Sequence, residues 1–450
     1  MKLRDFLKLM VMVMVLPLAF VACSENDEPE IPESVTLNEA DVDMLMGGTL
    51  QLTATVVSND PNSTAVTWTS SNPAVATVDN NGLITAVAPG EAVITATLGM
   101  GRAQATCEVE VDAENMLLVF NGGSMYSSID GSLSAVKFER SQTVSNNVFS
   151  TANGRSLGAT VQDGVVYGDN LYIAVDGSNT IEVVNKYSFK SVTTILPDQT
   201  AYEPRDIVAD DNYIYVSMYT GYVARIDPKT NKIDKTVQVG PNPEEMVVED
   251  GFLYVVNSDG LNYNYNYVNG KTVSKIDLKS FTEVKKIEVG LNPTAIVETE
   301  DKFFVLCMGN YGMDPNYEFV PTSIYVIDEN DNVTNTNLSA SFFAAEDGVL
   351  YVVDSPWGGS TSYVSYSAKD LSVISDQFVK DPVDAPAGIA VEDDRIFISS
   401  YNLVNGSASY NTDGYVNEYR TDATAVYPPN YQLVKKYDVG VGPVHMLVVD

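Results

Sequence analysis

A four-strand phrase that repeats along the last three quarters of this chain constrains the fold more than any other feature. Residues 204–227, PRDIVADDNYIYVSMYTGYVARID, read as a proline-led turn, an apolar strand, an acidic turn, an aromatic strand and a third strand. A fourth strand follows, and then the phrase restarts. Ile207 has counterparts, spaced 39 to 57 residues apart, at Met246, Ile296, Phe343, Ile389 and Met446. One such unit cannot bury both faces of its sheet, so the repeats are predicted to stack around an axis.

The two ends of the repeat region each carry an incomplete repeat. Residues 116–138, MLLVFNGGSMYSSIDGSLSAVKF, lack a first strand, whereas residues 442–450, GPVHMLVVD, are a first strand with nothing after it. We expect the two ends to complete one unit together and so to close the ring. Six full repeats begin near residues 158, 204, 243, 293, 341 and 386, which predicts a seven-bladed β-propeller over residues 115–450.

The motifs VGPNP, VGLNP and VGVGP, together with strands such as LYVVNS and IYVSMY, resemble the YVTN or YncE-like seven-bladed propellers. This resemblance covers the C-terminal three quarters of the chain and implies the fold. It does not imply one function, because the propeller fold hosts many unrelated activities.

Residues 34–112 predict a separate, small β-sandwich. Short alternating strands are divided by turn signals such as Asn72-Pro73 and Pro89-Gly90. The run WTSSNPAVATVDNNGLITAVAPGEAVITA resembles the group-2 bacterial immunoglobulin-like domain nearly from end to end. The resemblance implies a spacer or an adhesion module, and we expect Trp68 to be a core residue. The whole chain is therefore predicted to be all-β.

Residues 1–22 predict a lipoprotein signal peptide, with three basic residues followed by an apolar run that is short for a membrane span. Ala22-Cys23 resembles the lipobox of bacterial lipoproteins, which implies cleavage before Cys23 and lipidation of that residue. The acidic tether at 23–33 resembles the surface-export signal of Bacteroidota lipoproteins. We expect a lipid-anchored outer-membrane protein that faces the cell exterior; an ordinary periplasmic lipoprotein is the alternative.

Charge and residue counts disfavour several classes of function. The 26 basic and 60 acidic residues give a formal charge of −34, which argues against nucleic acid as a partner. The single histidine excludes a multi-histidine metal site, and no GxSxG, HExxH or phosphate loop occurs. We therefore expect no catalytic residues, no cofactor and no metal; a propeller lyase or hydrolase built on carboxylates is the less favoured alternative. Cys107 and Cys307 are predicted to be buried free thiols.

Four consecutive repeats carry long connections between their second and third strands. The connection spans 23 residues from Tyr254 to Asp277 and 24 from Phe304 to Asp328, against 12 from Tyr215 to Asp227. These loops, such as NSDGLNYNYNYVNGK and MGNYGMDPNYEFVP, are rich in Tyr, Asn, Ser and Gly. Tyrosine gives a large amphipathic contact area with few rotors to freeze, and Asn, Ser and Gly give adaptable hydrogen bonds. The composition favours a binding surface over loops that merely pack together.

Because the strands of a blade are antiparallel, these loops and the segments that lead into each repeat emerge on one face. We expect the ligand site there. The candidate loop residues are Tyr219, Tyr222, Asn257, Tyr263, Tyr265, Tyr267, Tyr311, Tyr317, Trp357, Tyr401, Tyr410 and Tyr415. The lead-in segments add Arg205, Asp206, Glu245 and His445, the only histidine of the chain.

The anchor, the propeller and the loop composition are together similar to the cobalamin-capturing surface propeller lipoproteins of gut Bacteroidota. That resemblance implies capture of a cobalamin-like small molecule or another nutrient on the long-loop face, and its delivery to a TonB-dependent transporter. The additional immunoglobulin-like domain departs from that group and puts direct contact with a transporter in doubt. The alternative is an adhesion or glycan-binding surface protein, since aromatic side chains also stack on sugar faces.

Overall fold

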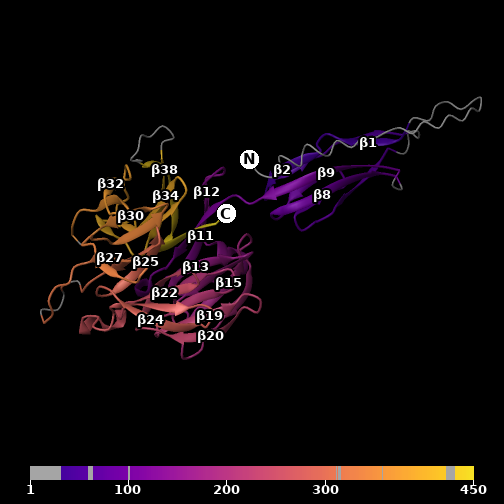
Figure 1. Ribbon diagram of the computed structural model, residues 1–450. Coiled ribbons are helices and arrows are strands. Elements are labelled where there is room, and N and C mark those ends of the chain that lie inside the picture. Colours follow the sequence, from indigo (N-terminus) through magenta and orange to yellow (C-terminus); the bar gives the residue numbers. More distant parts are fainter. Residues whose placement is uncertain are drawn as a thin grey trace, which may run out of the picture. The chain divides into compact units, whose positions relative to one another are not determined.

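The computed structural model describes residues 32–58, 64–99, 102–310, 312, 316–356, 358–421 and 431–449. The chain divides into two compact units, Met1–Ala113 and Glu114–Asp450 (Figure 1). Nearly all of its regular structure is β-strand. None of the helices in the described ranges is both long enough and apolar enough to cross a membrane.

Within its described residues, the first unit contains nine strands in three antiparallel or mixed sheets, ordered β2-β9-β8-β5, β3-β7-β6 and β1-β4. The strands are β1 (Ser34–Leu37), β2 (Asp41–Leu45), β3 (Thr49–Gln51), β4 (Ala54–Val57), β5 (Val66–Ser70), β6 (Ala76–Val78), β7 (Leu83–Ala86), β8 (Gly90–Leu98) and β9 (Ala103–Asp112). Side chains alternate between core and surface along β8, as the period-2 geometry of a strand requires.

The core of the first unit lies between these sheets. Leu52, Ile84 and Ile94 are fully buried in it, and Trp68 packs against the same cluster. Gly82, at φ +83°, lies directly under the indole, where a β-carbon would come within 2.8 Å of the ring. Cys107 is buried and free. The predictions of a core Trp68 and a buried thiol at Cys107 are confirmed.

The second unit contains, within the described residues, seven separate four-stranded antiparallel sheets. Five of them are built from consecutive strands. These are β13 (Val161–Tyr167), β14 (Asn170–Val175), β15 (Thr180–Asn185) and β16 (Ser191–Ile195); β17 (Pro204–Ala209), β18 (Ile214–Met218), β19 (Tyr222–Asp227) and β20 (Lys232–Gln238); β21 (Pro243–Glu249), β22 (Phe252–Asn257), β23 (Thr272–Asp277) and β24 (Thr282–Glu288); β25 (Pro293–Thr299), β26 (Lys302–Cys307), β27 (Ser323–Ile327) and β28 (Val333–Asn335); and β29 (Phe342–Glu346), β30 (Val349–Asp354), β31 (Ser362–Ser367) and β32 (Val373–Ser375).

The sixth and seventh sheets are not built from four consecutive strands. One is β33 (Pro386–Glu392), β34 (Arg395–Ser400), β37 (Asp413–Thr421) and β38 (Tyr431–Val441), with the hairpin β35 (Leu403–Val404) and β36 (Ser407–Ala408) inserted after β34. The other is ordered β12-β11-β10-β39 and contains β10 (Met116–Asn121), β11 (Ser132–Lys137), β12 (Thr143–Ser145) and β39 (Pro443–Val449). The short helices are η1 (Met125–Ser127), α2 (Val148–Asn153) and η2 (Gly260–Tyr265).

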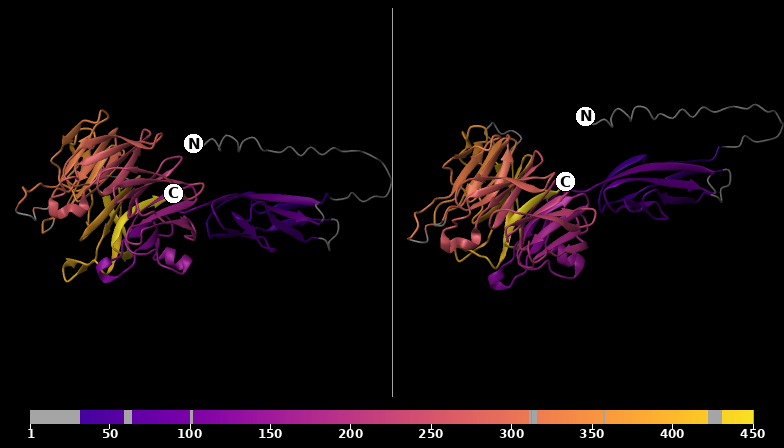
Figure 2. Two further views of the ribbon diagram at one scale, coloured as in Figure 1. Left: turned by 90° about the horizontal axis from the view of Figure 1, so that it is seen from below. Right: turned by 60° about the horizontal axis from the view of Figure 1, so that its bottom comes forward.

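The two ends of the second unit complete one sheet, as the sequence predicted. β39 pairs antiparallel with β10, which places Leu447 opposite Leu118. Every residue of β10 is buried, so this strand needs a neighbour on both edges and β39 provides one of them. Figure 2 shows the yellow C-terminal strand against the purple strands that open the unit.

The first strands of the sheets contact one another in the order β39, β13, β17, β21, β25, β29 and β33, and β33 contacts β39 again. The sheets therefore form a propeller-like arrangement about a common centre (Figures 1 and 2). The repeated reference position faces the cores between sheets: Ile207, Met246, Ile296, Phe343 and Met446 are all at most 9% exposed. The sheets stack because each needs its neighbour to cover this apolar face.

The recurring Val-Gly of the repeat marks a close approach between adjacent sheets. A β-carbon at Gly440 would come within 2.9 Å of the Asn121 amide carbon, and one at Gly290 within 2.9 Å of the Cys307 β-carbon. Only glycine leaves room for the last residue of the next sheet's second strand. Cys307 is buried and free, as predicted.

Candidate functional site

The lead-in segments of three neighbouring sheets place acidic side chains at the centre of the propeller-like unit. β13, β17 and β21 each have a register shift near their start. Bulges of this kind re-aim side chains. Asp163, Asp206 and Glu245 occupy equivalent repeat positions at these shifts and reach across to the next sheet.

Each of these carboxylates accepts a backbone hydrogen bond from the first strand of the following sheet. Asp163 Oδ2 accepts from the Ile207 amide at 3.0 Å, and Asp206 Oδ2 accepts from the Met246 amide at 2.8 Å. Glu245 Oε2 accepts from the Ile296 amide at 3.1 Å. The three acids thus connect four consecutive sheets, from β13 to β25.

His445 extends this series to the closing strand. Its Nε2 lies 2.9 Å from Asp163 Oδ1, and its ring lies 5.9 Å from the ring of Phe120. Burial opposes the imidazolium, but the charges of Asp163 and Glu245 outweigh it and raise the pKa of His445. We name His445, Asp163, Asp206 and Glu245 the central acid cluster.

The two acids farther from His445 are difficult to ionise. Burial, followed by the charge of Asp163, raises the pKa of Asp206 well above its usual range. Burial raises the pKa of Glu245 to about 7, although His445 opposes the shift. Burial also acts on Asp163, but His445 and the Ile207 amide stabilise its carboxylate, so the pKa of Asp163 is lowered. These shifts favour the charged forms of Asp163 and His445 over those of Asp206 and Glu245.

A second polar group lies beside the cluster, around Arg205. Its guanidinium contacts Glu244 Oε2 at 2.9 Å and Asp176 Oδ2 at 3.2 Å. It also lies 4.6 Å from the centre of the Tyr219 ring. Burial is the main cause that raises the pKa of Tyr219 to about 12. Arg205 already has two carboxylate partners, so it is poorly placed to bind an anionic ligand.

The long loop between β22 and β23 is held in shape by buried polar residues. Asp259 is fully buried and accepts hydrogen bonds from the Asn262 side chain and, at 2.9 Å, from the Asn269 amide. The neighbouring loop after β26 is organised by Asn310, whose Nδ2 donates to Asn266 Oδ1 at 2.7 Å. The same Nδ2 also donates to the Glu318 carbonyl at 2.7 Å. The contact between Asn310 and Asn266 ties the two loops together, and Figure 2 shows them side by side.

These two loops expose a concentration of large apolar side chains. Between 39% and 66% of each is exposed: Leu261, Tyr263, Tyr265, Val268, Tyr317 and Phe319. A groove of about 440 Å³ lies among them, lined by Tyr265, Val268 and Tyr317 together with Asn266, Lys271, Glu288, Val289, Leu291 and Val320. We name it the loop groove. An exposed apolar patch on loops held by hydrogen bonds is the main binding feature of this face.

The structure separates the predicted site residues into groups. Tyr265 and Tyr317 line the loop groove, and Tyr263 is exposed on the same loop as Tyr265, whereas the rings of Tyr401 and Tyr410 pack edge to face, 4.8 Å apart, in another loop. Five other predicted site residues lie in or beside the central acid cluster: Arg205, Asp206, Tyr219, Glu245 and His445. Tyr311, Trp357 and the predicted lipid site Cys23 lie outside the described residues.

Four predicted loop residues do not belong to the exposed surface. Asn257 is fully buried and donates its amide to the Thr272 and Ser274 hydroxyls. Tyr267 is 9% exposed and Tyr415 only 3%. Tyr222 packs against the core between two sheets. Tyr222, Asn257 and Tyr415 belong to the strands β19, β22 and β37 rather than to loops, and Tyr267 lies in the loop after β22 but is covered.

Sequence reasoning missed two kinds of residue. Leu261, Val268 and Phe319 were not predicted, because tyrosine is the residue that makes the composition of these loops distinctive. Asp163 was overlooked although it occupies the repeat position of Asp206 and Glu245. Aligning the first strands residue by residue would have found it. Within the described ranges, no group of three or more His, Cys, Asp or Glu side chains is arranged to hold a metal ion.

Two family models match the chain. Residues 32–109 match the bacterial Ig-like domain (group 2), so the predicted immunoglobulin-like domain is confirmed. Residues 115–261 match a domain of unknown function, DUF5074. The second match covers the first part of the propeller-like unit.

One solved structure supports the propeller-like fold, and a second is similar to part of the chain. A quinoprotein alcohol dehydrogenase-like protein from Bacteroides thetaiotaomicron aligns over 91% of this chain and 96% of its own, with a TM-score of 0.50 and 12% identity. Hydrazine synthase from Kuenenia stuttgartiensis aligns over 64% of this chain and 95% of its own, with a TM-score of 0.43 and 14% identity. The chain is thus all-β, with an immunoglobulin-like domain and a propeller-like fold.

Curated relatives match only segments. An uncharacterised protein of Clostridium acetobutylicum is 29% identical over 182 residues, or 40% of this chain and 16% of its own length. Lacto-N-biosidase of Bifidobacterium bifidum is 41% identical over 100 residues, or 20% and 9% of the two chains. Alpha-L-arabinofuranosidase of Bifidobacterium longum is 33% identical over 107 residues, or 24% and 10%. The chain therefore spans a small part of the relatives that it matches.

Proposed function

We propose that this protein is a lipid-anchored outer-membrane protein that captures a ligand in the loop groove of a YncE-like, seven-bladed propeller. The seven four-stranded sheets and the circuit of their first strands support the seven-bladed arrangement. The anchor rests on the sequence around Cys23. The capture role rests on one observation, the exposed aromatic side chains at a groove between two tightly hydrogen-bonded loops.

Exposed tyrosines on ordered loops are better suited to binding than to stability. Tyr263 and Tyr265 are 63% and 66% exposed, so they bury little area in the free protein. Their loop is fixed by Asp259 and by the contact of Asn266 with Asn310, so little ordering is required when a ligand arrives. Preorganised aromatic groups of this kind raise affinity by lowering the entropic cost of binding.

The ligand that we propose first is a cobalamin or another nutrient with a broad, flat surface. Tyr263, Tyr265 and Tyr317 are exposed on the two loops that form the groove, so their rings are available to a broad, flat ligand. A TonB-dependent transporter is the proposed recipient, reached through the membrane anchor.

Glycan binding is the second candidate, and the lining of the groove favours it. Tyr265 and Tyr317 line it beside the amide of Asn266, a combination of aromatic face and hydrogen-bonding edge that suits a sugar ring. Two curated relatives that share segments with this chain, a lacto-N-biosidase and an alpha-L-arabinofuranosidase, are named for sugar substrates.

We infer a structural rather than a catalytic role for the central acid cluster. Asp163, Asp206 and Glu245 each already accept a backbone hydrogen bond from the next sheet. A general acid or base must be free to exchange its proton with a substrate. A lyase or hydrolase is therefore the less favoured reading of this centre.

Calorimetry with the purified protein tests the proposal. Cyanocobalamin is titrated into the parent and into a variant with Tyr263, Tyr265 and Tyr317 changed to Ala. Central aromatic contacts are each worth at least about 2 kcal/mol in well-packed interfaces, so the triple variant is expected to lose at least 100-fold in affinity. The matched control is Tyr126→Ala, which removes a fully exposed tyrosine from η1, in the loop between β10 and β11.

The result also distinguishes the candidates. Cobalamin binding that the triple variant retains would place the site elsewhere and refute the loop groove. If cobalamin gives no heat, a panel of oligosaccharides is titrated next, and binding that the triple variant abolishes would establish the glycan candidate. The absence of both would reject capture by this groove.

A further inference from the structure

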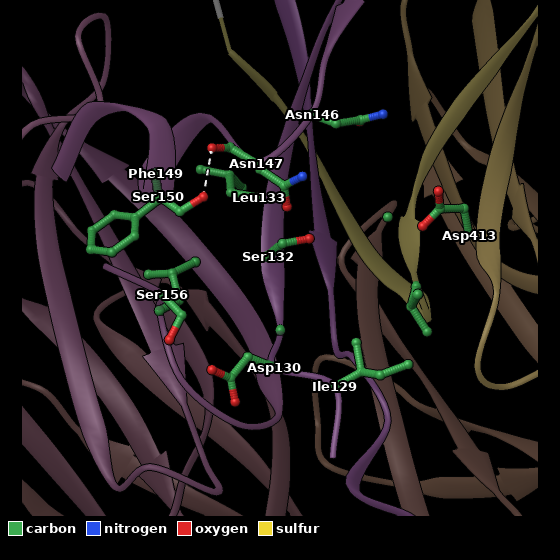
Figure 3. Close-up of a pocket in the computed structure, with 14 residues that line it drawn as sticks. Ile129, Asp130, Ser132, Leu133, Asn146, Asn147, Phe149, Ser150, Ser156 and Asp413 are labelled. Carbon is green, nitrogen blue, oxygen red and sulfur yellow. Dashed lines mark hydrogen bonds between the residues drawn. The ribbon is translucent and has the colours of Figure 1, made fainter. Parts of the chain in front are cut away.

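A pocket of about 250 Å³ lies where the two ends of the propeller-like unit meet. One side is formed by residues 129–133, at the start of β11, and by residues between 146 and 157, around α2. The other side is formed by Asp413 at the start of β37 and by Gly440 and Val441 at the end of β38 (Figure 3). We name it the seam pocket. It shares no lining residue with the loop groove, and it exists only when the first and last sheets lie together.

The seam pocket has an apolar base and a polar rim. Leu133, Phe149 and Leu157 are at most 5% exposed and form the base. Exposed polar side chains stand at the rim, and Figure 3 shows Asp130, Ser156 and Asp413 around the opening. Within the described part of the chain, the side chains of these three residues have no hydrogen-bond partner in the protein. Their hydrogen-bonding capacity is therefore available to a ligand.

The lining chemistry restricts the ligand. It includes two carboxylates, Asp130 and Asp413, and several hydroxyl and amide groups, but no Lys, Arg or His. An anion would find no counter-charge there and would be repelled by both acids. A ligand with several hydroxyl groups can donate to the carboxylates and accept from the serine and asparagine side chains.

The volume of the seam pocket restricts the class of ligand further. Sites for drug-sized ligands have volumes of roughly 300–1,000 Å³, so a pocket of about 250 Å³ holds a smaller molecule. The apolar base suits the carbon–hydrogen face of a sugar ring, and the rim suits its hydroxyl edge. We propose that the seam pocket binds one neutral monosaccharide unit, either free or at the end of a glycan.

Binding in the seam pocket has a consequence for the fold. The ligand would contact residues from both ends of the unit, Asp130 from its first sheet and Asp413 from its last. A ligand that binds only the folded, closed unit stabilises it by mass action. A sugar that occupies this pocket therefore raises the unfolding temperature of the propeller-like unit.

The test uses the purified protein with glucose, galactose, mannose and N-acetylglucosamine, beside spermidine and inorganic phosphate. Saturation-transfer NMR and thermal unfolding measure binding. At least one neutral sugar is expected to show saturation transfer and to raise the unfolding temperature, without dependence on salt. Asp130→Ala and Asp413→Ala are each expected to weaken the affinity at least tenfold. Asp376→Ala is the matched control, since Asp376 is an exposed aspartate outside the pocket.

The loop-groove variant separates this site from the proposed function. Sugar binding at the seam persists when Tyr263, Tyr265 and Tyr317 are changed to Ala, because none of these residues lines the pocket. Three results would overturn the proposal: no neutral sugar binds, binding survives both pocket substitutions, or spermidine alone binds with a salt-dependent affinity. Sugar binding that the loop-groove variant abolishes would also overturn it and would assign the sugar to the groove.

Discussion

At the scale of single residues, the central acid cluster shows how one repeat position serves the fold. Asp163, Asp206 and Glu245 all lie at a register shift, and each accepts a backbone hydrogen bond from the first strand of the next sheet. Burying neighbouring acids has a cost, which appears as the raised pKa values of Asp206 and Glu245. His445 offsets part of this cost by pairing with Asp163.

The cluster predicts that stability depends on pH. Burial raises the pKa of Glu245 from 4.5 to about 7, so between these values the folded state binds more protons than the unfolded state. Stability must then fall as the pH rises through this window. The raised pKa values of Asp206 and His445 act in the same direction. The lowered pKa of Asp163 has the opposite effect on stability. That effect is a loss of stability as the pH falls below 3.8, the ordinary pKa of an aspartate.

Glu245→Gln tests this dependence. Glutamine keeps an acceptor oxygen for the Ile296 amide and cannot ionise, so the variant is expected to be more stable than the parent at pH 8, by on the order of 2 kcal/mol. The measurement is urea unfolding at pH 5 and pH 8, followed by the near-ultraviolet circular dichroism of the buried tyrosines. The exposed Glu139→Gln is the control. A parent and variant with equal pH slopes would contradict the assignment.

At the scale of elements, β39 is the strand on which closure depends. It pairs with β10 on one edge and contacts β13 and β33, so it joins the last sheet to the first. Met446 lies in the middle of this strand and packs with Leu117, Val119 and Phe397 in the core between those sheets. Loss of volume at Met446 therefore weakens the last interface of the unit.

Met446→Ala is expected to destabilise the propeller-like unit by about 2–4 kcal/mol, because it removes a buried side chain and leaves a cavity. Thermal unfolding of the purified protein measures the effect. Met125→Ala is the matched control, since Met125 is 70% exposed and its loss should change stability by less than about 0.5 kcal/mol. Equal unfolding temperatures for the two variants would show that closure does not rely on this contact.

At the scale of the whole molecule, the two units have separate cores. Leu52, Ile84 and Ile94 form a core in the first unit. In the second unit, each core lies between neighbouring sheets, such as the one around Ile207 and Val216. Among the described residues, no core cluster takes side chains from both units. Each unit therefore has its own source of stability.

Separate cores predict separate unfolding. Residues 114–450, produced without the first unit, are expected to fold and to unfold within a few degrees of the corresponding transition in the intact protein, since about 1 kcal/mol shifts the midpoint of a large domain by only about 2–4 °C. Differential scanning calorimetry of the intact protein and of both fragments checks this. A single transition in the intact protein, absent from both fragments, would show that the units depend on each other.

The sequence by itself determined the sheets and their closure. Strand patterns are local, so the positions of Ile207 and its counterparts marked the first strands within a few residues. The incomplete repeats at residues 116–138 and 442–450 predicted the pairing of β10 with β39, because an apolar strand without a neighbour must find one. Trp68 and the thiols of Cys107 and Cys307 followed from the same apolar alternation.

The tertiary structure decided which loop residues are accessible. Tyr265 and Tyr267 lie two residues apart in the same tyrosine-rich run, yet Tyr265 is 66% exposed and Tyr267 only 9%. Nothing in that run distinguishes them, because the shape of the loop is set by Asp259, which accepts from the Asn269 amide, and by Asn310 from the next loop, which donates to Asn266. The central acid cluster and the seam pocket likewise join residues that are far apart in sequence. Contacts between distant segments create these sites, and no local pattern encodes such contacts.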